Sequence, residues 1–409
     1  MRVAFYLNLQ GAGHCRRFEA IAPHLPSDFE LAVVGMDGPP QVAALDRPIE
    51  RVSVPSYGPQ SHNPFVQQQI AHEYHDFLVN HGDNTPFTVA MVSFLGRWKP
   101  DLVVSDVGLE ASILARMCGI PVIYGRQHGR RWDKGHTLAY DWACSLLAPF
   151  SEELEQSDCP QWVREKTFYS GGFSRFAGRE KARTAPPNYA TEKPNILVMT
   201  GFGGTQITPQ DVITAAESTP QWRWHFLGAD LIQSPFIHSP GLVQDVWPYL
   251  CQADLVIANA GHNSTMEIGA AGVPSICIPA QRYFDEQDCK AAVIDAMSLS
   301  VVSRQWPDPT DWPELWQRAI ALSSTRWQSL QDPDAPKRAA QHIADIARQC
   351  ARQGVKQCAK HPDLEDTNLE DTLDIIDSST DSSANQTEVT QTREKEIAAP
   401  QADRPLLTI

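Results

Sequence analysis

The sequence predicts an α/β protein of two Rossmann-like domains that face each other across a cleft, followed by a disordered acidic tail. A strand that runs into glycines occurs at residues 3–13 and again at 195–204. A second unit, Asp-apolar run-Gly, helix, Gly-apolar-Pro, occurs at 101–123 and returns with the same internal offsets from 254. Repetition of two successive units indicates two domains built on one plan.

Length and composition fit two domains without a membrane span. The 409 residues and 42% hydrophobic content are ample for two cores. No apolar run approaches the roughly 18 residues that cross a bilayer. The first strand runs into a glycine turn without a cleavage pattern, so we expect a cytoplasmic protein. The nine cysteines are scattered without metal-ligand spacing, which argues against a disulfide framework or a zinc site.

Charge is concentrated at the end of the chain. Residues 361–409 hold 12 acidic and 3 basic residues, so they account for −9 of the net charge of −15. We expect residues 360–409 to form a disordered tail, a candidate for recruiting a protein partner. The mildly acidic body lacks the basic stripe that nucleic-acid binding needs. Peripheral attachment at the inner membrane face stays open, because a local basic patch can override the overall charge.

The first domain is expected over residues 1–176 and opens with a strand, a glycine turn and a helix to about residue 25. Its further strands are expected at 31–34, 49–54 and 101–106, with a helical segment at 65–98. The opening Gly-x-Gly-x-x-Arg lacks the third glycine of a dinucleotide fingerprint. Asp37 lies roughly where an NAD-binding acid would be, so a dehydrogenase is an alternative for this half alone.

The segment 126–136 is the densest basic patch of the body and contains Arg126 and His128. Such a run is usually a solvated loop. Because it follows a strand of the first domain, contact with an anionic or phosphate-bearing acceptor is the second interpretation.

A linker is expected at 177–194 and a second domain at 195–355, with a strand at 224–227. Its last helix should run from about Asp334 to Cys350 with alanines along one stripe. Tryptophans 306, 312, 316 and 327 are expected to pack in the core rather than to face a membrane.

The stretch 254–287 holds the most informative motif. Residues 259–265 form a loop where a helix begins, so free N–H groups and the positive end of the helix dipole would face an anion such as a phosphate. Glu267 is placed to bind a sugar diol beside it. The alternative is that Asn263, Ser264 and Thr265 are helix caps, with Glu267 completing a capping box with Ser264.

Gly-His-Asn-Ser-Thr-Met-Glu, Gly-Val-Pro, Pro279 and Asp285-Glu-Gln resemble the donor-binding signature of nucleotide-sugar-dependent glycosyltransferases of the GT-B architecture. The UDP-sugar glycosyltransferases and the lipid-linked N-acetylglucosaminyl transferase of peptidoglycan synthesis, families 1 and 28, are the most similar. The resemblance implies a nucleotide-sugar co-substrate, a UDP-sugar by preference, and no other cofactor.

The same resemblance implies a donor site in the second domain. Its phosphate contacts would come from Gly204, Thr205, Gly261, His262, Asn263, Ser264 and Thr265, and Gly13 of the first domain would also contact the donor. Glu267 would bind the ribose, Asp285 and Gln287 the sugar, and the backbone near Val246 the base. Asn259 stands where many relatives have a phosphate-binding histidine, which leaves the donor open. No Asp-x-Asp metal motif is evident among these residues, so no metal is expected.

For the base that activates the acceptor hydroxyl, His14 is the candidate, and the resemblance implies that an aspartate orients it, a partner that Asp106 at the end of its strand matches. A carboxylate beside imidazole fixes the tautomer and stabilises the imidazolium, and direct attack would invert the anomeric carbon. The alternative is that both residues are caps or turn residues. A nonulosonate-type UDP-sugar hydrolase, a nucleotide-sugar 2-epimerase and a non-catalytic nucleotide-sugar-binding protein are the rival functions. The acceptor, whether small molecule, glycan or lipid-linked, is not encoded in any motif.

Overall fold

The computed structural model describes residues 1–358 except 9–12, 39, 44, 57–83, 177, 181–191, 202–203, 244 and 323–324. The expected acidic tail at 360–409 and most of the expected linker at 177–194 lie outside this part of the chain, as does the first part of the helical segment expected at 65–98. Residues 1–354 form one compact unit that contains two sheets.

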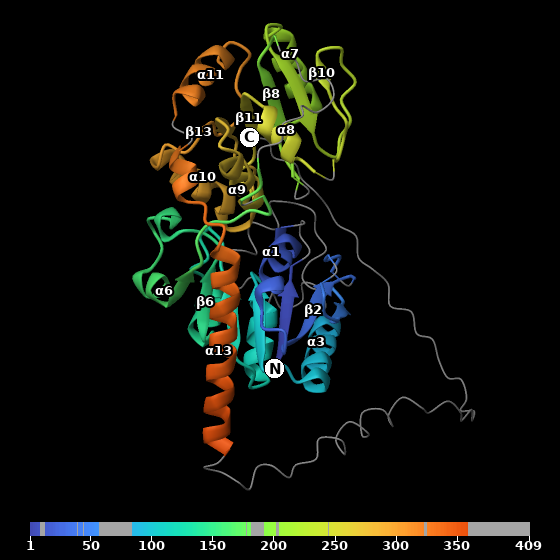
Figure 1. Ribbon diagram of the computed structural model, residues 1–409, viewed down its shortest axis with the longest axis vertical. Helices are drawn as coiled ribbons and strands as arrows, with labels where there is room; N and C mark the ends of the chain where they lie inside the picture. Colours follow the sequence, from blue (N-terminus) through green and yellow to red (C-terminus); the bar gives the residue numbers. More distant parts are fainter. Residues whose placement is uncertain are drawn as a thin grey trace, which may run out of the picture. The chain divides into compact units, whose positions relative to one another are not determined.

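The first sheet is entirely parallel, with the strand order β3-β2-β1-β4-β5-β6-β7 (Figure 1). Its strands are β1 (Arg2–Leu7), β2 (Glu30–Met36), β3 (Ile49–Val54), β4 (Leu102–Asp106), β5 (Val122–Gly125), β6 (Ser145–Ala148) and β7 (Thr167–Tyr169). Its helices are α1 (Gly13–Ile21), α3 (Thr85–Trp98), α4 (Leu109–Met117), α5 (Lys134–Trp142) and α6 (Gln161–Lys166), with short turns η1 (Ala22–His24) and η2 (Glu152–Leu154). The predicted strands of this domain are confirmed.

The second sheet repeats the plan with the order β10-β9-β8-β11-β12-β13. Its strands are β8 (Asn195–Met199), β9 (Arg223–Leu227), β10 (Ile237–His238), β11 (Leu255–Ala258), β12 (Ser275–Cys277) and β13 (Val301–Val302). Its helices are α7 (Pro209–Ser218), α8 (Trp247–Gln252), α9 (His262–Ala271), α10 (Glu286–Ala296), α11 (Trp312–Ala321), α12 (Thr325–Ser329) and the last helix α13 (Ala335–Cys358), with η3 (Tyr283–Asp285). The run β2-β1-β4-β5 corresponds to β9-β8-β11-β12, so the repeated units seen in the sequence occupy matching places.

Helices cover both faces of each parallel sheet, so each sheet has its own buried core. In the first sheet, Phe18 of α1 packs on one face and Phe87 of α3 on the other. In the second, Trp224 and Trp312 pack with an edge-to-face geometry at 5.5 Å between ring centroids. Trp327 is also buried, and its Nε1 donates to the Leu299 carbonyl at 2.7 Å. Trp312 and Trp327 therefore serve core packing, as expected.

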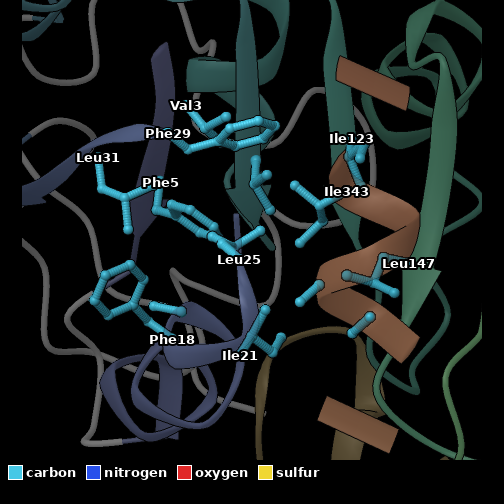
Figure 2. Packing of buried hydrophobic residues seen from close by; sticks show 14 of the residues in the cluster. Val3, Phe5, Phe18, Ile21, Leu25, Phe29, Leu31, Ile123, Leu147 and Ile343 are labelled. Carbon is cyan, nitrogen blue, oxygen red and sulfur yellow. The ribbon is translucent and has the colours of Figure 1, made fainter. Parts of the chain in front are cut away.

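Helix α13 returns to the first sheet, which the sequence did not reveal. Its alanine stripe and Ile343 belong to the same buried cluster as Phe5 of β1. Figure 2 shows Ile343 beside Ile123 of β5 and Leu147 of β6. His342 adds a polar contact, since its Nε2 lies 2.8 Å from the Ser145 hydroxyl. The expected second domain at 195–355 thus includes a helix whose apolar face completes the other core.

The chain passes between the sheets at two places that pair with each other. Gly172 and Gln331 form a parallel bridge, and the Asp332 amide donates to the Gly172 carbonyl at 2.7 Å. Gln331 Nε2 donates to the Met266 carbonyl in α9 at 3.2 Å. Both crossing segments are therefore tied to the helix that carries the central motif.

Candidate active site

The expected dyad of His14 and Asp106 is assembled by strand pairing. Strands β1 and β4 are neighbours in register, with Leu7 opposite Asp106, so the loop after β1 and the end of β4 share one edge of the sheet. His14, in the first turn of α1, places its Nδ1 3.0 Å from Asp106 Oδ2. Both residues are buried. Parallel sheets bind ligands at the carboxyl ends of their strands, and this pair lies there.

Arg17 shares the same carboxylate, which no motif indicated. Its Nε donates to Asp106 Oδ2 at 2.9 Å and its Nη2 to Oδ1 at 3.1 Å. Burial by itself raises the pKa of Asp106, but the charges of Arg17 and His14 outweigh it and lower the pKa to about 2. Asp106 is therefore a carboxylate throughout the physiological pH range.

The position of Arg17 also bears on the tautomer of His14. Arg17 Nη2 lies 2.9 Å from His14 Nδ1. Arginine only donates and the Asp106 carboxylate only accepts, so Nδ1 either donates to Asp106 or accepts from Arg17. Only the first arrangement leaves Nε2 with a free lone pair. A base at His14 therefore requires the proton on Nδ1, directed to Asp106.

Helix α9 begins without a side-chain cap. Gly261 is its N-cap residue, no side chain caps it, and its first turn contains no acid. Thr265 instead directs its hydroxyl to the carbonyls of Gly261 and His262, at 3.0 and 2.9 Å. The interpretation of Asn263, Ser264 and Thr265 as ordinary caps is wrong, because the helix starts before Asn263 and Ser264. The first-turn N–H groups are left for an external acceptor.

The two helix starts come together. A Cβ built on Gly13 would lie 3.5 Å from Asn263 Nδ2, so the first turn of α1 contacts the first turn of α9. The predicted residues His14, Gly13 and Asn263 thus converge from the two sheets. The starts of α1 and α9 therefore lie next to each other.

Glu267 does not bond Ser264 in a capping box. Its Oε1 accepts from Arg175 Nε at 2.8 Å, and burial raises its pKa although Arg175 opposes the shift. Arg175 follows the first crossing segment and also lies over the Phe176 ring. Arg175 therefore holds Glu267 in place through Oε1. The other carboxylate oxygen of Glu267, Oε2, does not accept this bond from Arg175 Nε.

The segment 284–287 is held against the first domain in a strained backbone. Phe284 and Asp285 have φ values of 57° and 52°, in the left-handed region that L residues rarely adopt. The Arg130 amide donates to the Phe284 carbonyl at 2.7 Å, and Arg130 Nη1 lies 3.2 Å from Asp285 Oδ2. Gln287 Oε1 accepts from the Ala280 amide at 2.8 Å. Backbone strain of this kind persists only where surrounding contacts enforce it.

The remaining predicted donor residues lie on nearby loops of the second sheet. Gly204 has a φ of 84°, and Arg282 Nη2 donates to its carbonyl, which links it to the segment before Asp285. The hydroxyl of Thr205 accepts from the Ile207 amide at 3.1 Å. Val246 is the N-cap residue of α8, where Trp247 is buried.

Two residues of the basic segment 126–136 have a structural role, which the prediction of an acceptor-binding segment did not include. Arg126 is 1% exposed, and its Nη1 donates to Glu155 Oε2 at 2.9 Å. His128 is equally buried, with Nε2 2.7 Å from the Leu154 carbonyl, and burial lowers its pKa to about 4. Arg126 Nη1 and Nη2 and His128 Nε2 are engaged inside the first domain, so neither residue is proposed as an acceptor contact.

Residues 237–305 match the family model described as the glycosyltransferase family 28 C-terminal domain. An uncharacterized glycosyltransferase of Methanosarcina acetivorans is 27% identical over 50% of this chain and 60% of its own length. The UDP-N-acetylglucosamine--N-acetylmuramyl-(pentapeptide) pyrophosphoryl-undecaprenol N-acetylglucosamine transferase of Sodalis glossinidius is 24% identical over 61% of this chain and 74% of its own. A spinosyn rhamnosyltransferase complexed with thymidine diphosphate superposes with a TM-score of 0.55 at 16% identity, over 87% of this chain and all of that one.

The fold is GT-B. Within this GT-B chain the match covers both sheets, and the family model falls on the half with the open helix start. The matched relative from Methanosarcina is covered over less than two thirds of its length.

A polar network that no motif indicated joins the two halves of this GT-B fold. In the amide orientation that satisfies both of its ends, Gln127 accepts from Arg17 Nη2 at 2.7 Å and donates to Glu286 Oε1 at 2.7 Å. Glu286 Oε2 accepts from Arg131 Nη2 at 2.6 Å. The dyad is thus connected through Arg17 and Gln127 to the residue between Asp285 and Gln287. The spacing of Arg17, three residues after His14 on one helix, was the available signal.

Lys290 is the second residue that the motifs missed. It lies on α10, is 3% exposed, and places Nζ 3.3 Å from His262 Nδ1. Among the residues that the structure describes, no group of three or more His, Cys, Asp or Glu could hold a metal ion. Across the same residues, no helix is both long enough and apolar enough to span a membrane.

Proposed function

We propose that this GT-B chain is an inverting, metal-independent glycosyltransferase that moves a sugar from a nucleotide-sugar donor to an acceptor hydroxyl. The observation that carries the proposal is the meeting of the His14–Asp106 pair with the uncapped start of α9, at the contact of Gly13 with Asn263. A base and an anion site at one place are what transfer from a nucleoside diphosphate sugar requires.

In the proposed reaction the second sheet holds the donor. The first-turn N–H groups of α9 bind the diphosphate, Glu267 the ribose, and Asp285 with Gln287 the sugar. Gly204, Thr205 and the backbone at Val246 complete the nucleotide site. We propose a pyrimidine nucleotide, UDP by preference, because the Sodalis relative is named for a UDP-sugar and the spinosyn enzyme was solved with thymidine diphosphate.

The first sheet supplies the base. With Nδ1 donating to Asp106, Nε2 of His14 takes the proton of the acceptor hydroxyl while that oxygen attacks the anomeric carbon. The bond from this carbon to the diphosphate oxygen breaks, and its electron pair leaves with the nucleoside diphosphate. A single direct displacement inverts the anomeric configuration. No cofactor besides the nucleotide sugar takes part in this scheme.

The acceptor is the open part of the proposal. The Sodalis relative acts on a pyrophosphoryl-undecaprenol acceptor, so a lipid-linked acceptor and a location at the inner membrane face are one candidate. A polyprenyl diphosphate sugar therefore belongs in the assay with small-molecule alcohols and glycans.

The test is a panel of UDP- and dTDP-sugars, each incubated with and without these acceptors, with released nucleotide measured by chromatography. We expect nucleotide release that depends on an acceptor and a product of inverted configuration by NMR. Rapid release in water alone would assign a hydrolase. Calorimetric binding of a nucleotide sugar with no turnover under any condition would assign a binding protein.

A further inference from the structure

Helix α10 buries a lysine whose charge is not balanced by a neighbouring acid. Lys290 is 3% exposed, and no carboxylate among the described residues lies within 4.0 Å of its amine. Glu286, four residues earlier on the same helix, is bound by Arg131 at 2.6 Å. Asp288, two residues earlier, pairs with Arg304 at 3.6 Å. Buried ammonium groups are rare in proteins unless they are paired, because desolvation is costly. The position of Lys290 therefore calls for a functional explanation.

The contact of Lys290 with His262 determines which hydrogen-bond donors the two side chains leave available to a ligand. In its ammonium form lysine has donors only, so Nζ then donates to His262 Nδ1 at 3.3 Å. His262 then carries its proton on Nε2, and that buried nitrogen has no hydrogen-bond partner in the described part of the chain. Burial first, and then the charge of Lys290, lower the pKa of His262 well below its ordinary value. The imidazole is neutral, and the pair presents donors without acceptors.

The pair lies at the uncapped helix start. His262 is the first residue of α9 and directly follows the N-cap residue Gly261. The backbone N–H groups of His262, Asn263 and Ser264 have no intrahelical acceptor, as at every helix start. Two kinds of donor therefore gather here, the free first-turn amides and the side chains of Lys290 and His262. A group with several acceptor oxygens and negative charge is the complementary ligand.

The acids that could neutralise this place are already engaged. Asp106 receives two hydrogen bonds from Arg17, at 2.9 and 3.1 Å. Glu286 receives one from Arg131 and one from Gln127. The local surplus of positive charge thus remains for a ligand.

We propose that Lys290 binds the diphosphate of the donor and neutralises the negative charge that forms on it as the sugar departs. This inference rests on the proposed function and adds to it the cation that a metal supplies in other transferases. As the bond from the anomeric carbon to the diphosphate breaks, its electron pair moves to the diphosphate oxygen. Lys290 donates hydrogen bonds to the diphosphate in this step and transfers no proton, while the acceptor proton goes to His14.

The decisive variant is Lys290→Met, which keeps the length of the side chain and removes its charge. Charge-assisted hydrogen bonds are about twice as strong as neutral ones, so we expect affinity for UDP to fall about 10- to 100-fold, with uridine affinity unchanged. At saturating donor, we expect kcat to fall by about 10²-fold or more, because the charge is largest in the transition state. Lys337→Met, at an exposed position on α13, removes the same charge without these effects.

Proton uptake gives a readout that a merely structural lysine would not produce. Burial lowers the pKa of Lys290 to about 7, and a bound diphosphate should raise it again. Its charged or titratable neighbours are Glu286, Cys277, Arg17, His262 and His128. UDP binding at pH 8 should therefore take up protons in calorimetry across buffers of different ionisation enthalpy, and UDP affinity should decline as pH rises above about 7. Lys290→Met should abolish the uptake.

The outcomes separate this inference from the function beneath it. Unchanged UDP affinity and kcat in Lys290→Met, with the wild-type protein active, would overturn the role of Lys290 alone. A loss confined to UDP-glucuronate, with UDP and UDP-glucose unaffected, would assign Lys290 to a sugar carboxylate and equally overturn it. A wild-type protein that binds neither UDP nor dTDP would remove the proposed function and this inference together. Lys290→Gln provides the same comparison if the methionine variant does not fold.

Discussion

The starts of helices α4 and α9 occupy equivalent places in the two halves, yet one is closed and the other open. A Cβ built on Gly108, the N-cap residue of α4, would lie 2.4 Å from the Tyr6 ring. Among the described residues, a Cβ on Gly261, the N-cap residue of α9, would meet only the Ser264 hydroxyl at 3.8 Å. The same strand-helix frame thus ends in a packed surface in one half and, within the described part of the chain, in an open N-cap in the other.

Charge follows the same division. The first turn of α4 contains the buried Glu110, whereas the first turn of α9 contains no acid. An acid in the first turn complements the positive end of the helix dipole within the protein. In α9 that complement is left to a ligand. In the function that we propose, the first half uses its strand edge for proton transfer through side chains, and the second uses the matching edge for anion binding through backbone and Lys290.

The largest expected effect separates the two roles. His14→Ala should reduce kcat by about 10² to 10⁴-fold, since a positioned general base contributes this much. Stabilisation of the protein by UDP in thermal unfolding should survive, because the nucleotide binds the second half. Loss of both properties together would mean that the two edges form one inseparable site. Wild-type turnover would remove His14 as the base.

The next effect concerns the charged edge of the first half. The pKa of Asp106 is lowered to about 2 from an ordinary 3.8, so its ionised form contributes stability above about pH 4 and loses it as pH falls towards 2. By linkage the amount is about 2 kcal/mol. Urea unfolding over pH 2 to 5 should show a steeper loss of stability in the wild type than in Asp106→Asn, which keeps only the contributions of other carboxylates such as Asp245 and Asp332. Parallel slopes would mean that Arg17 and His14 do not select the carboxylate.

A substitution with a smaller expected effect places an acid in the first turn of α9, as Glu110 is in the first turn of α4. Asn263→Asp keeps the shape of the side chain and places an acid in the first turn of α9. We expect UDP affinity to fall about tenfold while folding stability changes by less than about 1 kcal/mol, in the stabilising direction. Calorimetry and thermal unfolding measure the two quantities.

Glu110→Gln is the matched change in the closed half. It should leave UDP affinity unaltered and lower stability, because the helix start loses its internal complement. Equal effects of the two substitutions on UDP binding would contradict the division between the halves.

The sequence predicted the frame because the frame is repeated. The strands at 49–54 and 224–227, and the matched units at 101 and 254, follow from apolar runs and Gly-Pro punctuation, which are local properties. The pairing of His14 with Asp106 was expected from the resemblance to GT-B glycosyltransferases, and the structure places the two side chains 3.0 Å apart. Predicting the strands and the repeated units does not require knowing which residues pack against one another in the fold.

The residues that were missed depend on tertiary burial. Glu286 and Lys290 are four apart on one helix, the spacing of an exposed ion pair, and only the fold shows that both are turned to other partners. Arg126 belongs to a run that reads as a solvated loop, yet Glu155 from a later loop binds it inside the first domain. A local pattern cannot distinguish these environments, because the deciding neighbour lies elsewhere in the chain.

Helix α13 is synthesised after the strands of the first sheet, whose core it completes. The ribosome releases the strands of the first sheet well before Ile343 and the alanine stripe that complete their core. Until then Phe5, Ile123 and Leu147 share an apolar surface that lacks its last cover. The core of the first sheet is therefore incomplete until α13 has been synthesised. A fragment that stops after β7 should associate with itself or with a chaperone rather than remain a stable monomer.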